Sequence, residues 1–344
     1  MVKQRGITIA GSLIADVFYD IQSYPEEGKL SKIETVTRHV GGSGNIILDL
    51  AKMDPSLNVV VSAIIGNDED GASILNELQQ YPNISDRGIV RKGRSSVTHV
   101  MNAKDTLQRT FFFDGAASDH YDENAIDWNQ ITTNIFQLEY LLLMNKVDAF
   151  DDDYGTHGAK LLHDAQKLGM LTSIDIVSEQ SPRANAVLDA ALVYTDICTI
   201  NELEAIANTG INFILPDGSF DQQAVQEALL NLRDKGVSKW AIIHSPYENY
   251  ALDCQSGEFV ASPSLNLPEG YIMGTTGAGD AYCAGVLYGA YCGWPLIKTL
   301  QFAAGSAACS LSSANGSQGL RRVPKIWDLI ARYSSEGQSK FQTS

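Results

Sequence analysis

The sequence predicts an α/β fold: a Rossmann-like, mostly parallel sheet sandwiched by helices, with a small β lid. Three observations support this class. Short apolar segments rich in β-branched residues alternate with segments of helical periodicity, which is typical of a parallel sheet covered on both faces. The chain has 344 residues, of which 44% are hydrophobic, enough to bury a large core. Two β-rich stretches, 32–40 and 95–113, lack a following helix and are therefore expected outside the main sheet.

The first expected strand covers residues 6–14 and places Asp16 just past its carboxyl end. Strands and helices then alternate, and two helical stretches rich in small residues complete the chain. The further expected strands are 58–65, 140–144, 171–176, 196–200 and 240–244. The expected helices are 45–53, 71–80, 156–168, 202–208, 222–235, 277–289 and 295–313.

The two stretches that break the alternation predict the lid. Residues 96–100 and 109–113 have the pattern of paired antiparallel strands, so we expect lid segments at about 17–40 and 95–115. We find no repeat or linker, and residues 1–333 are predicted to form one domain, followed by a polar tail at 334–344. An exposed β lid offers a strand edge that a second subunit can cover, which suggests a homodimer through the lid.

Charge and cysteine content narrow the function classes. The net charge is −16 and the pI is about 4.7, which argues against nucleic acid or an anionic membrane as a partner. The sequence shows neither a signal-peptide pattern nor an apolar run of membrane-spanning length. The five cysteines show no CxxC spacing, which favours free thiols in a reducing compartment. We therefore expect a cytoplasmic protein.

The most informative motif is Gly-Thr-Thr-Gly-Ala-Gly-Asp at residues 274–280, which leads into an apolar helical run. Gly277, Ala278 and Gly279 allow a tight turn whose N–H groups point at one spot. The positive end of the helix dipole lies at the same place and favours an anion such as a phosphate. Asp280 adds a carboxylate that can take a proton from a hydroxyl attacking that phosphate. The simpler interpretation is a glycine turn with Asp280 as a helix cap.

A second glycine block, Gly-Gly-Ser-Gly-Asn at residues 41–45, also precedes an apolar helix. It is neither a P-loop nor a dinucleotide fingerprint, because the required Gly-Lys and third glycine are missing. Asn45 can donate to and accept from a sugar hydroxyl, and Asp16 can bind two hydroxyls at once. A turn with a helix cap is the alternative. For the acidic turn at 66–71, helix capping is the favoured interpretation.

Asn201 and Glu204 follow an expected strand and are three residues apart, so they share one helical face. At the carboxyl end of a parallel strand, the pair can orient a hydrated Mg²⁺ and a phosphate. The alternative is a capping box at the helix N-terminus. On the expected lid, Arg109 can reach a substrate oxygen, whereas the aromatic strip 111–113 is more typical of a core.

Taken in this order, the motifs resemble those of the ribokinase/PfkB family of carbohydrate and nucleoside kinases, from about residue 6 to 330. The Gly-Ala-Gly-Asp block is the most specific of them. The resemblance implies a ribokinase-like fold with a β lid, and ATP-dependent phosphorylation of a hydroxymethyl group of a small sugar. It implies Asp280 as the base and Gly277, Ala278 and Gly279 as the anion hole. It further implies Asn201 and Glu204 for phosphate and Mg²⁺, with the ion held by phosphates and water and Glu204 acting through water, and Asp16, Gly42 and Asn45 for the sugar. We also expect Thr275 at the ATP phosphates and Arg109 of the lid at the substrate.

Three features depart from the family pattern. Two residues, rather than the usual three, separate the glycine pair from Asn45. Gly274 stands where potassium-dependent members carry an aspartate, so the resemblance does not imply potassium activation. His-Ser-Pro at residues 244–246 replaces the usual donor loop, so the nucleotide contacts there must differ. Two alternatives stay open: a nucleoside kinase that stacks a base on residues 111–113, and a sugar-binding or regulatory protein with weak catalysis.

Overall fold

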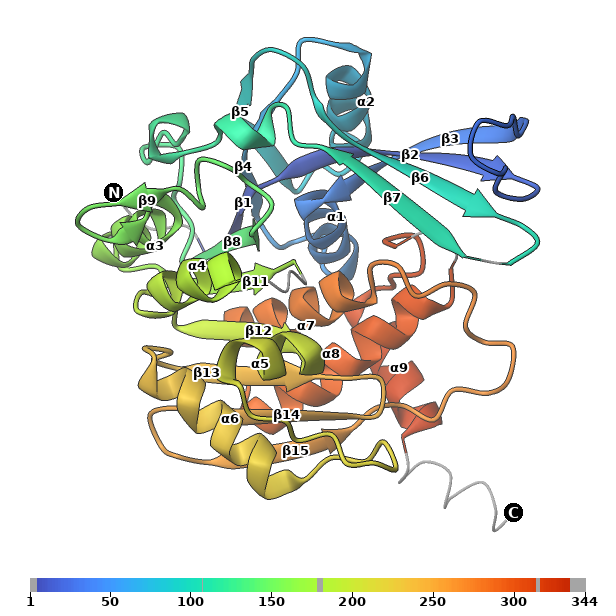
Figure 1. Cartoon of the computed structure of the whole chain (residues 1–344). Coiled ribbons are helices and arrows are strands. Elements are labelled where there is room, and N and C mark those ends of the chain that lie inside the picture. Colours follow the sequence, from blue (N-terminus) through green and yellow to red (C-terminus); the bar gives the residue numbers. More distant parts are fainter. Residues whose placement is uncertain (1–4, 107, 178–181, 314–315, 335–344) are drawn as a thin grey trace.

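A nine-stranded sheet runs through the computed structural model, which describes residues 5–106, 108–177, 182–313 and 316–334 (Figure 1). Seven neighbouring strands are parallel, and the two at one edge are antiparallel. From that edge the order is β15 (Phe259–Pro263), β14 (Glu248–Asp253), β13 (Trp240–His244), β12 (Ile197–Asn201), β11 (Leu171–Ile176), β8 (Ile135–Leu141), β1 (Ile7–Gly11), β4 (Val59–Ile65) and β5 (Ile84–Arg91). The expected α/β class is confirmed.

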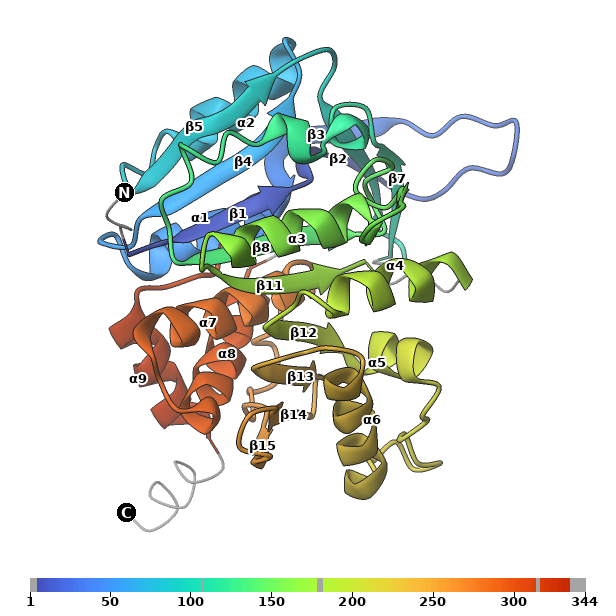
Figure 2. The same cartoon turned by 90° about the vertical axis from the view of Figure 1, so that its left-hand side faces the viewer.

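Helices cover both faces of this sheet (Figure 2). One face carries α3 (His157–Lys167), α4 (Pro182–Leu192), α5 (Glu202–Thr209) and α6 (Gln222–Asp234). The other carries α1 (Ser43–Met53), α2 (Glu69–Leu78), α7 (Ala278–Cys292), α8 (Leu296–Leu311) and α9 (Val323–Tyr333). The chain also forms a two-stranded ribbon from β9 (Phe150–Asp151) and β10 (Gly155–Thr156), and two short 3₁₀ helices at Ser118–His120 and Glu123–Ala125.

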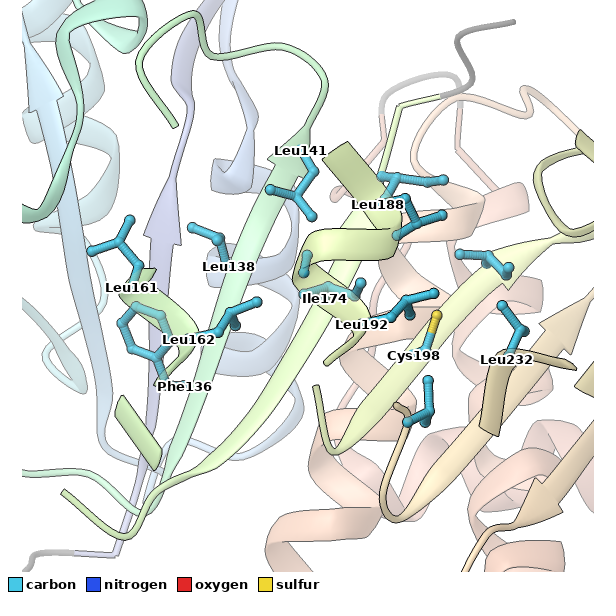
Figure 3. Packing of buried hydrophobic residues seen from close by; sticks show 14 of the residues in the cluster. Phe136, Leu138, Leu141, Leu161, Leu162, Ile174, Leu188, Leu192, Cys198 and Leu232 are labelled. Atoms are coloured by element: carbon cyan, nitrogen blue, oxygen red, sulfur yellow. The ribbon is translucent and has the colours of Figure 1, made fainter. Parts of the chain in front are cut away.

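Strand β8 shows how the sheet divides its side chains between the two faces. Phe136 and Leu138 pack into the hydrophobic cluster beneath α3 and α4, where Leu161 and Leu192 meet them (Figure 3). Because successive residues of a strand face opposite sides, Glu139 is directed to the face covered by α7. This alternation brings a carboxylate under the helix that begins at the glycine-rich loop.

A separate four-stranded sheet, called the small sheet below, projects from the main sheet (Figure 1). Its order is β3 (Ile33–Gly42), β2 (Leu13–Ile21), β6 (Ser96–Ala103) and β7 (Arg109–Asp114). The expected antiparallel pairing of 96–100 with 109–113 is confirmed as β6 with β7. The expected segments 17–40 and 95–115 therefore contain most of this sheet.

Two expected strands are wrong in their bounds. Residues 6–14 are not one strand: β1 ends at Gly11, whose φ is 131°, and β2 begins at Leu13 in the small sheet. Asp16 therefore lies within β2, not past a strand end in the main sheet. The strand expected at 140–144 is β8, which ends at Leu141, because Tyr140 and Leu142 take positive φ values of 60° and 78°.

Several strands and helices of the structure were not predicted. They are strands β14 and β15, which return antiparallel without a helix between them, strand β5, and helices α4 and α9. The tail expected at 334–344 lies, apart from Ser334, outside the described residues. Within the described residues, none of the helices combines the length and hydropathy that crossing a membrane requires.

Candidate active site

The glycine-rich loop ends in a left-handed turn at the start of α7. Gly277 precedes the helix with φ 77°, a backbone conformation that L side chains rarely adopt. A Cβ at this position would lie 2.6 Å from Cα of Gly316, so the loop also passes too close to another backbone segment for a side chain. Ala278 and Gly279 follow at the helix N-terminus, where N–H groups lack intrahelical partners and favour an anion. The Ala278 N–H donates to Thr275 O at 3.3 Å in this structure. The structure thus gives the loop the backbone that an anion hole needs.

Asp280 lies in the first turn of α7 and is 7% exposed. Its two oxygens accept hydrogen bonds from two distant parts of the chain. Asn45 Nδ2 donates to Oδ2 at 2.8 Å, and Tyr140 Oη donates to Oδ1 at 2.5 Å. Burial raises the pKa of Asp280, while both donors act to lower it. Sequence reasoning placed Asn45 at the substrate, and the structure places it on Asp280 as well as at a small hollow beside it.

That hollow is the candidate acceptor site, and it has a volume of about 20 Å³, room for a single water molecule. Among its lining residues are Asp16, Phe18, Asn45 and Thr276. Gly41 explains how Asp16 fits: a Cβ on Gly41 would lie 2.1 Å from Asp16 Oδ2. Gly42, the N-cap of α1, is similarly confined, because its Cβ would lie 2.4 Å from Ser12 O. Because Asp16 and the Ser12 carbonyl come so close to the backbone, neither position of the pair has room for a side chain.

Burial raises the pKa of Asp16 to about 7, opposed by a hydrogen bond from Thr98 and reinforced by the nearby Asp280. Because this value lies above the value of an unfolded chain, the group's contribution to folding stability is lost as pH rises through 7. We expect Asp16→Asn to raise Tm at pH 8 by about 2–6 °C and to change it little at pH 4. Asp20→Asn on the same strand is the matched control. Equal Tm values for wild type and Asp16→Asn at pH 8 would contradict a buried charge at this position.

Arg109 connects the small sheet to the glycine-rich loop. Its guanidinium donates a hydrogen bond to Thr276 Oγ1, and its Cζ lies 5.8 Å from the ring centre of Phe18. Arg109 itself is not among the residues that line the hollow. The three phenylalanines that follow on β7 are exposed at 38–56% and do not line it either. The aromatic side chains at the candidate acceptor site are those of Phe18 and His39, whose ring centres are 5.9 Å apart.

A larger cavity of about 640 Å³ opens on the other side of the loop. Thr275, Ala278 and Gly279 contribute to its wall, and so does Asn201. The atypical segment 244–246 also lines it, so the part of the sequence that departs from the family pattern lies at this cavity. His244 stacks on Tyr282 with ring centres 4.8 Å apart, and burial lowers the His244 pKa to about 4, leaving a neutral ring at pH 7. Sequence reasoning missed the apolar wall, which comes from α8 and from residues 265–272.

Asn201 and Glu204 form a capping box at the start of α5. Asn201 Oδ1 accepts from the backbone N–H groups of Leu203 and Glu204, and Glu204 Oε2 accepts from the N–H of Asn201 at 2.9 Å. The alternative interpretation of this pair is therefore what the structure shows. Asn201 still lines the large cavity, whereas Glu204 is buried behind it. At the 66–71 turn the favoured interpretation is confirmed, because Asp68 caps α2 by accepting from Gly71 N–H.

Residues 7–321 match the family of pfkB carbohydrate kinases. The chain belongs to this family. Among curated relatives, 1-phosphofructokinase of Escherichia coli strain K12 is 25% identical over 308 residues, which span 89% of this chain and 90% of the relative. A 59-residue stretch, 17% of this chain and 18% of the relative, is 37% identical to 5-dehydro-2-deoxygluconokinase of Geobacillus thermodenitrificans.

Solved structures share the fold. A ribokinase of Arabidopsis thaliana, complexed with ribose and ATP, superposes with a TM-score of 0.77 at 18% identity, covering 96% of this chain and 99% of that one. A nucleoside kinase of Methanocaldococcus jannaschii gives 0.72 at 17% identity, covering 97% and 100%. The ribokinase-like fold expected from the sequence is confirmed, and the chain is an ATP-dependent carbohydrate kinase by family.

Proposed function

We propose that this PfkB kinase transfers the γ-phosphoryl group of ATP to a hydroxymethyl group of a small sugar. One observation carries the proposal: Asp280 lies at the N-terminus of α7, with the glycine-rich loop before it and two hollows lined by residues of that loop. ATP occupies the large cavity, and the sugar occupies the small hollow beside Asp16 and Asn45. We further propose that residues 1–333 act as one domain, with the small sheet as a lid, in a reducing cytoplasm that suits the free cysteines.

In this reaction Asp280 takes the proton of the sugar hydroxyl as its oxygen attacks the γ-phosphorus, and the bond to the bridging oxygen breaks to release ADP. The N–H groups of the glycine-rich loop bind the transferring group. Oxygen donors suit Mg²⁺, and Asn201, with Glu204 through water, would hold the ion that enters with the nucleotide. That ion would neutralise charge on the phosphates. Because the hollow has room for only about one water, the sugar enters with a movement of the small sheet.

A substrate panel tests the proposal. Purified protein with ATP and Mg²⁺ is offered pentoses, hexoses, hexose phosphates and nucleosides, and ADP release is followed in each case. We expect turnover with at least one free sugar. A preference for nucleosides would support the alternative kinase, although the aromatic residues 111–113 that suggested it do not line the acceptor hollow. Sugar binding without ADP release would identify a binding or regulatory protein.

We also propose that the small sheet carries a homodimer interface. Its outer strands present Ile33 and Val36 on β3 and the phenylalanines of β7, all at least 38% exposed. Exposed apolar residues on strand edges favour association with a second copy. We expect a dimer by light scattering coupled to size exclusion. Val36→Lys combined with Phe112→Lys should give monomers, and wild-type protein that is monomeric in the same measurement would contradict the interface.

A further inference from the structure

Three carboxylates lie together beneath the start of α7. Glu139 on β8, Asp175 on β11 and Asp280 on α7 have oxygens that all lie within 4.8 Å of one another, and all three side chains are buried. In a desolvated site, like charges at such a distance do not all ionise together. The surroundings therefore determine which carboxylate is charged and which hold protons.

The hydrogen-bond donors around the three carboxylates differ. Asp280 receives a side-chain donor on each oxygen, from Tyr140 and from Asn45. Glu139 Oε2 accepts a hydrogen bond from Gln137 Nε2 at 2.7 Å, and Glu139 Oε1 has no hydrogen-bond partner within the described part of the chain. Asp175 Oδ1 accepts from the adjacent backbone N–H of Ile176 at 2.8 Å. Donors to both oxygens favour the ionised form most strongly at Asp280.

Tyr140 reaches Asp280 from an unusual backbone conformation. Its φ of 60° lies in the left-handed region, which is uncommon for a bulky residue and persists where surrounding contacts determine it. Leu142 also has positive φ, so the chain turns sharply at the end of β8. The turn places the Tyr140 hydroxyl 2.5 Å from Asp280 Oδ1.

We propose that Tyr140 is a positioning residue for the catalytic base: with Asn45, its hydroxyl selects Asp280 as the charged member of the three-carboxylate cluster. This inference rests on the proposed role of Asp280 as the base. The Tyr140 hydroxyl does not itself take the substrate's proton.

The protonation of the cluster agrees with this selection. Burial raises the pKa of Glu139 to about 8, so that its protonated form predominates at pH 7, and burial also raises the pKa of Asp175 well above its usual range, which favours the protonated form there. Burial and the neighbouring carboxylates also raise the pKa of Tyr140, which keeps its hydroxyl a donor. The titratable groups that face Asp280 from the surrounding elements are Asp16 on β2, Asp49 on α1, Glu139 and Tyr140 on β8, Asp175 on β11 and Cys283 on α7.

Tyr140→Phe tests the proposal through the pH dependence of kcat/KM. Removing a donor to the ionised form raises the pKa of Asp280, so the acidic limb should move to higher pH by about 1–2 units, as expected for a charge-assisted hydrogen bond. Below the limb, activity should fall about 10- to 100-fold, and raising the pH should restore it. Tyr121→Phe is the matched control, because it removes a buried hydroxyl that bonds Ser62 Oγ at 2.9 Å in the core, away from this cluster.

A uniform loss of kcat/KM at every pH, with the limb unmoved, would show a merely structural role for Tyr140 and overturn the inference. A second readout does not require activity: carbon NMR of protein labelled at aspartate carboxyls, with the Asp280 signal assigned by its loss in Asp280→Asn. We expect the pH midpoint of the Asp280 carboxyl signal to rise by the same amount, about 1–2 units, in Tyr140→Phe. An unchanged midpoint would overturn the inference. A shifted midpoint in a protein that turns over no acceptor would sustain the selection while refuting the proposed function.

Discussion

Asp280→Asn should lower kcat by about 10²–10⁴-fold while leaving ATP affinity within about twofold, because removing a general base affects the transition state more than ground-state binding. The amide keeps the volume of the carboxylate and still offers Tyr140 an oxygen acceptor. Asn45 can turn its own amide to accept from the new NH₂ group. Since the substitution also removes a buried charge, we expect no fall in Tm. Single-turnover kinetics and calorimetry with ATP measure the two effects separately.

The matched control for this substitution is Asp328→Asn, which alters an exposed carboxylate of α9 that pairs with Lys325. Its kcat should equal that of wild type. Should Asp280→Asn turn over near the wild-type rate with the best acceptor, Asp280 would be a helix cap and the base would lie elsewhere.

Gly277→Ala is expected to have the second-largest effect, a loss of about 10²-fold in kcat, comparable with losing one anion-hole donor. Two strains combine at this position. The left-handed φ of 77° costs roughly 1–2 kcal/mol for an L side chain, and the added Cβ would lie 2.6 Å from the Gly316 backbone. The loop must shift, and its N–H groups then miss the transferring phosphoryl group. Steady-state kinetics with saturating ATP and acceptor measure the loss.

Gly218→Ala separates the two strains. Gly218 has a φ of 83°, but nothing lies within 4 Å of the position its Cβ would take. This variant should lose stability to a similar degree through its backbone alone and keep wild-type kcat. If Gly277→Ala also kept wild-type kcat, the glycine-rich loop would not form the anion hole.

The order of strands and helices could be predicted because buried parallel strands and amphipathic helices have distinct periodicities. Elements outside that alternation could not. Strands β14 and β15 return antiparallel, and β1 passes into β2 through a single break after Gly11. The sequence alone therefore placed Asp16 at a strand end, although it lies within the small sheet.

Some residues of the candidate site could likewise be predicted from the sequence, and others could not. Gly277 and Asp280 could be found because local sequence dictates a glycine turn at a helix start. Tyr140 was missed because its role depends on a positive φ and on the true bounds of β8. The strand begins at Ile135, five residues before the expected start at 140, and ends at Leu141, three residues before the expected end at 144. A polar ring at the carboxyl end of a strand next to β1 was the available signal, since those ends meet at one edge of a parallel sheet.

The central claim is that this chain moves a phosphoryl group from ATP to a sugar hydroxymethyl group with Asp280 as the base. Phosphorus NMR of the reaction with the best acceptor from the panel tests it most directly. We expect one phosphomonoester on a primary carbon of the sugar for each ADP formed, and none with Asp280→Asn on the same time scale. Inorganic phosphate in place of the ester, or an ester formed equally fast by Asp280→Asn, would contradict the account.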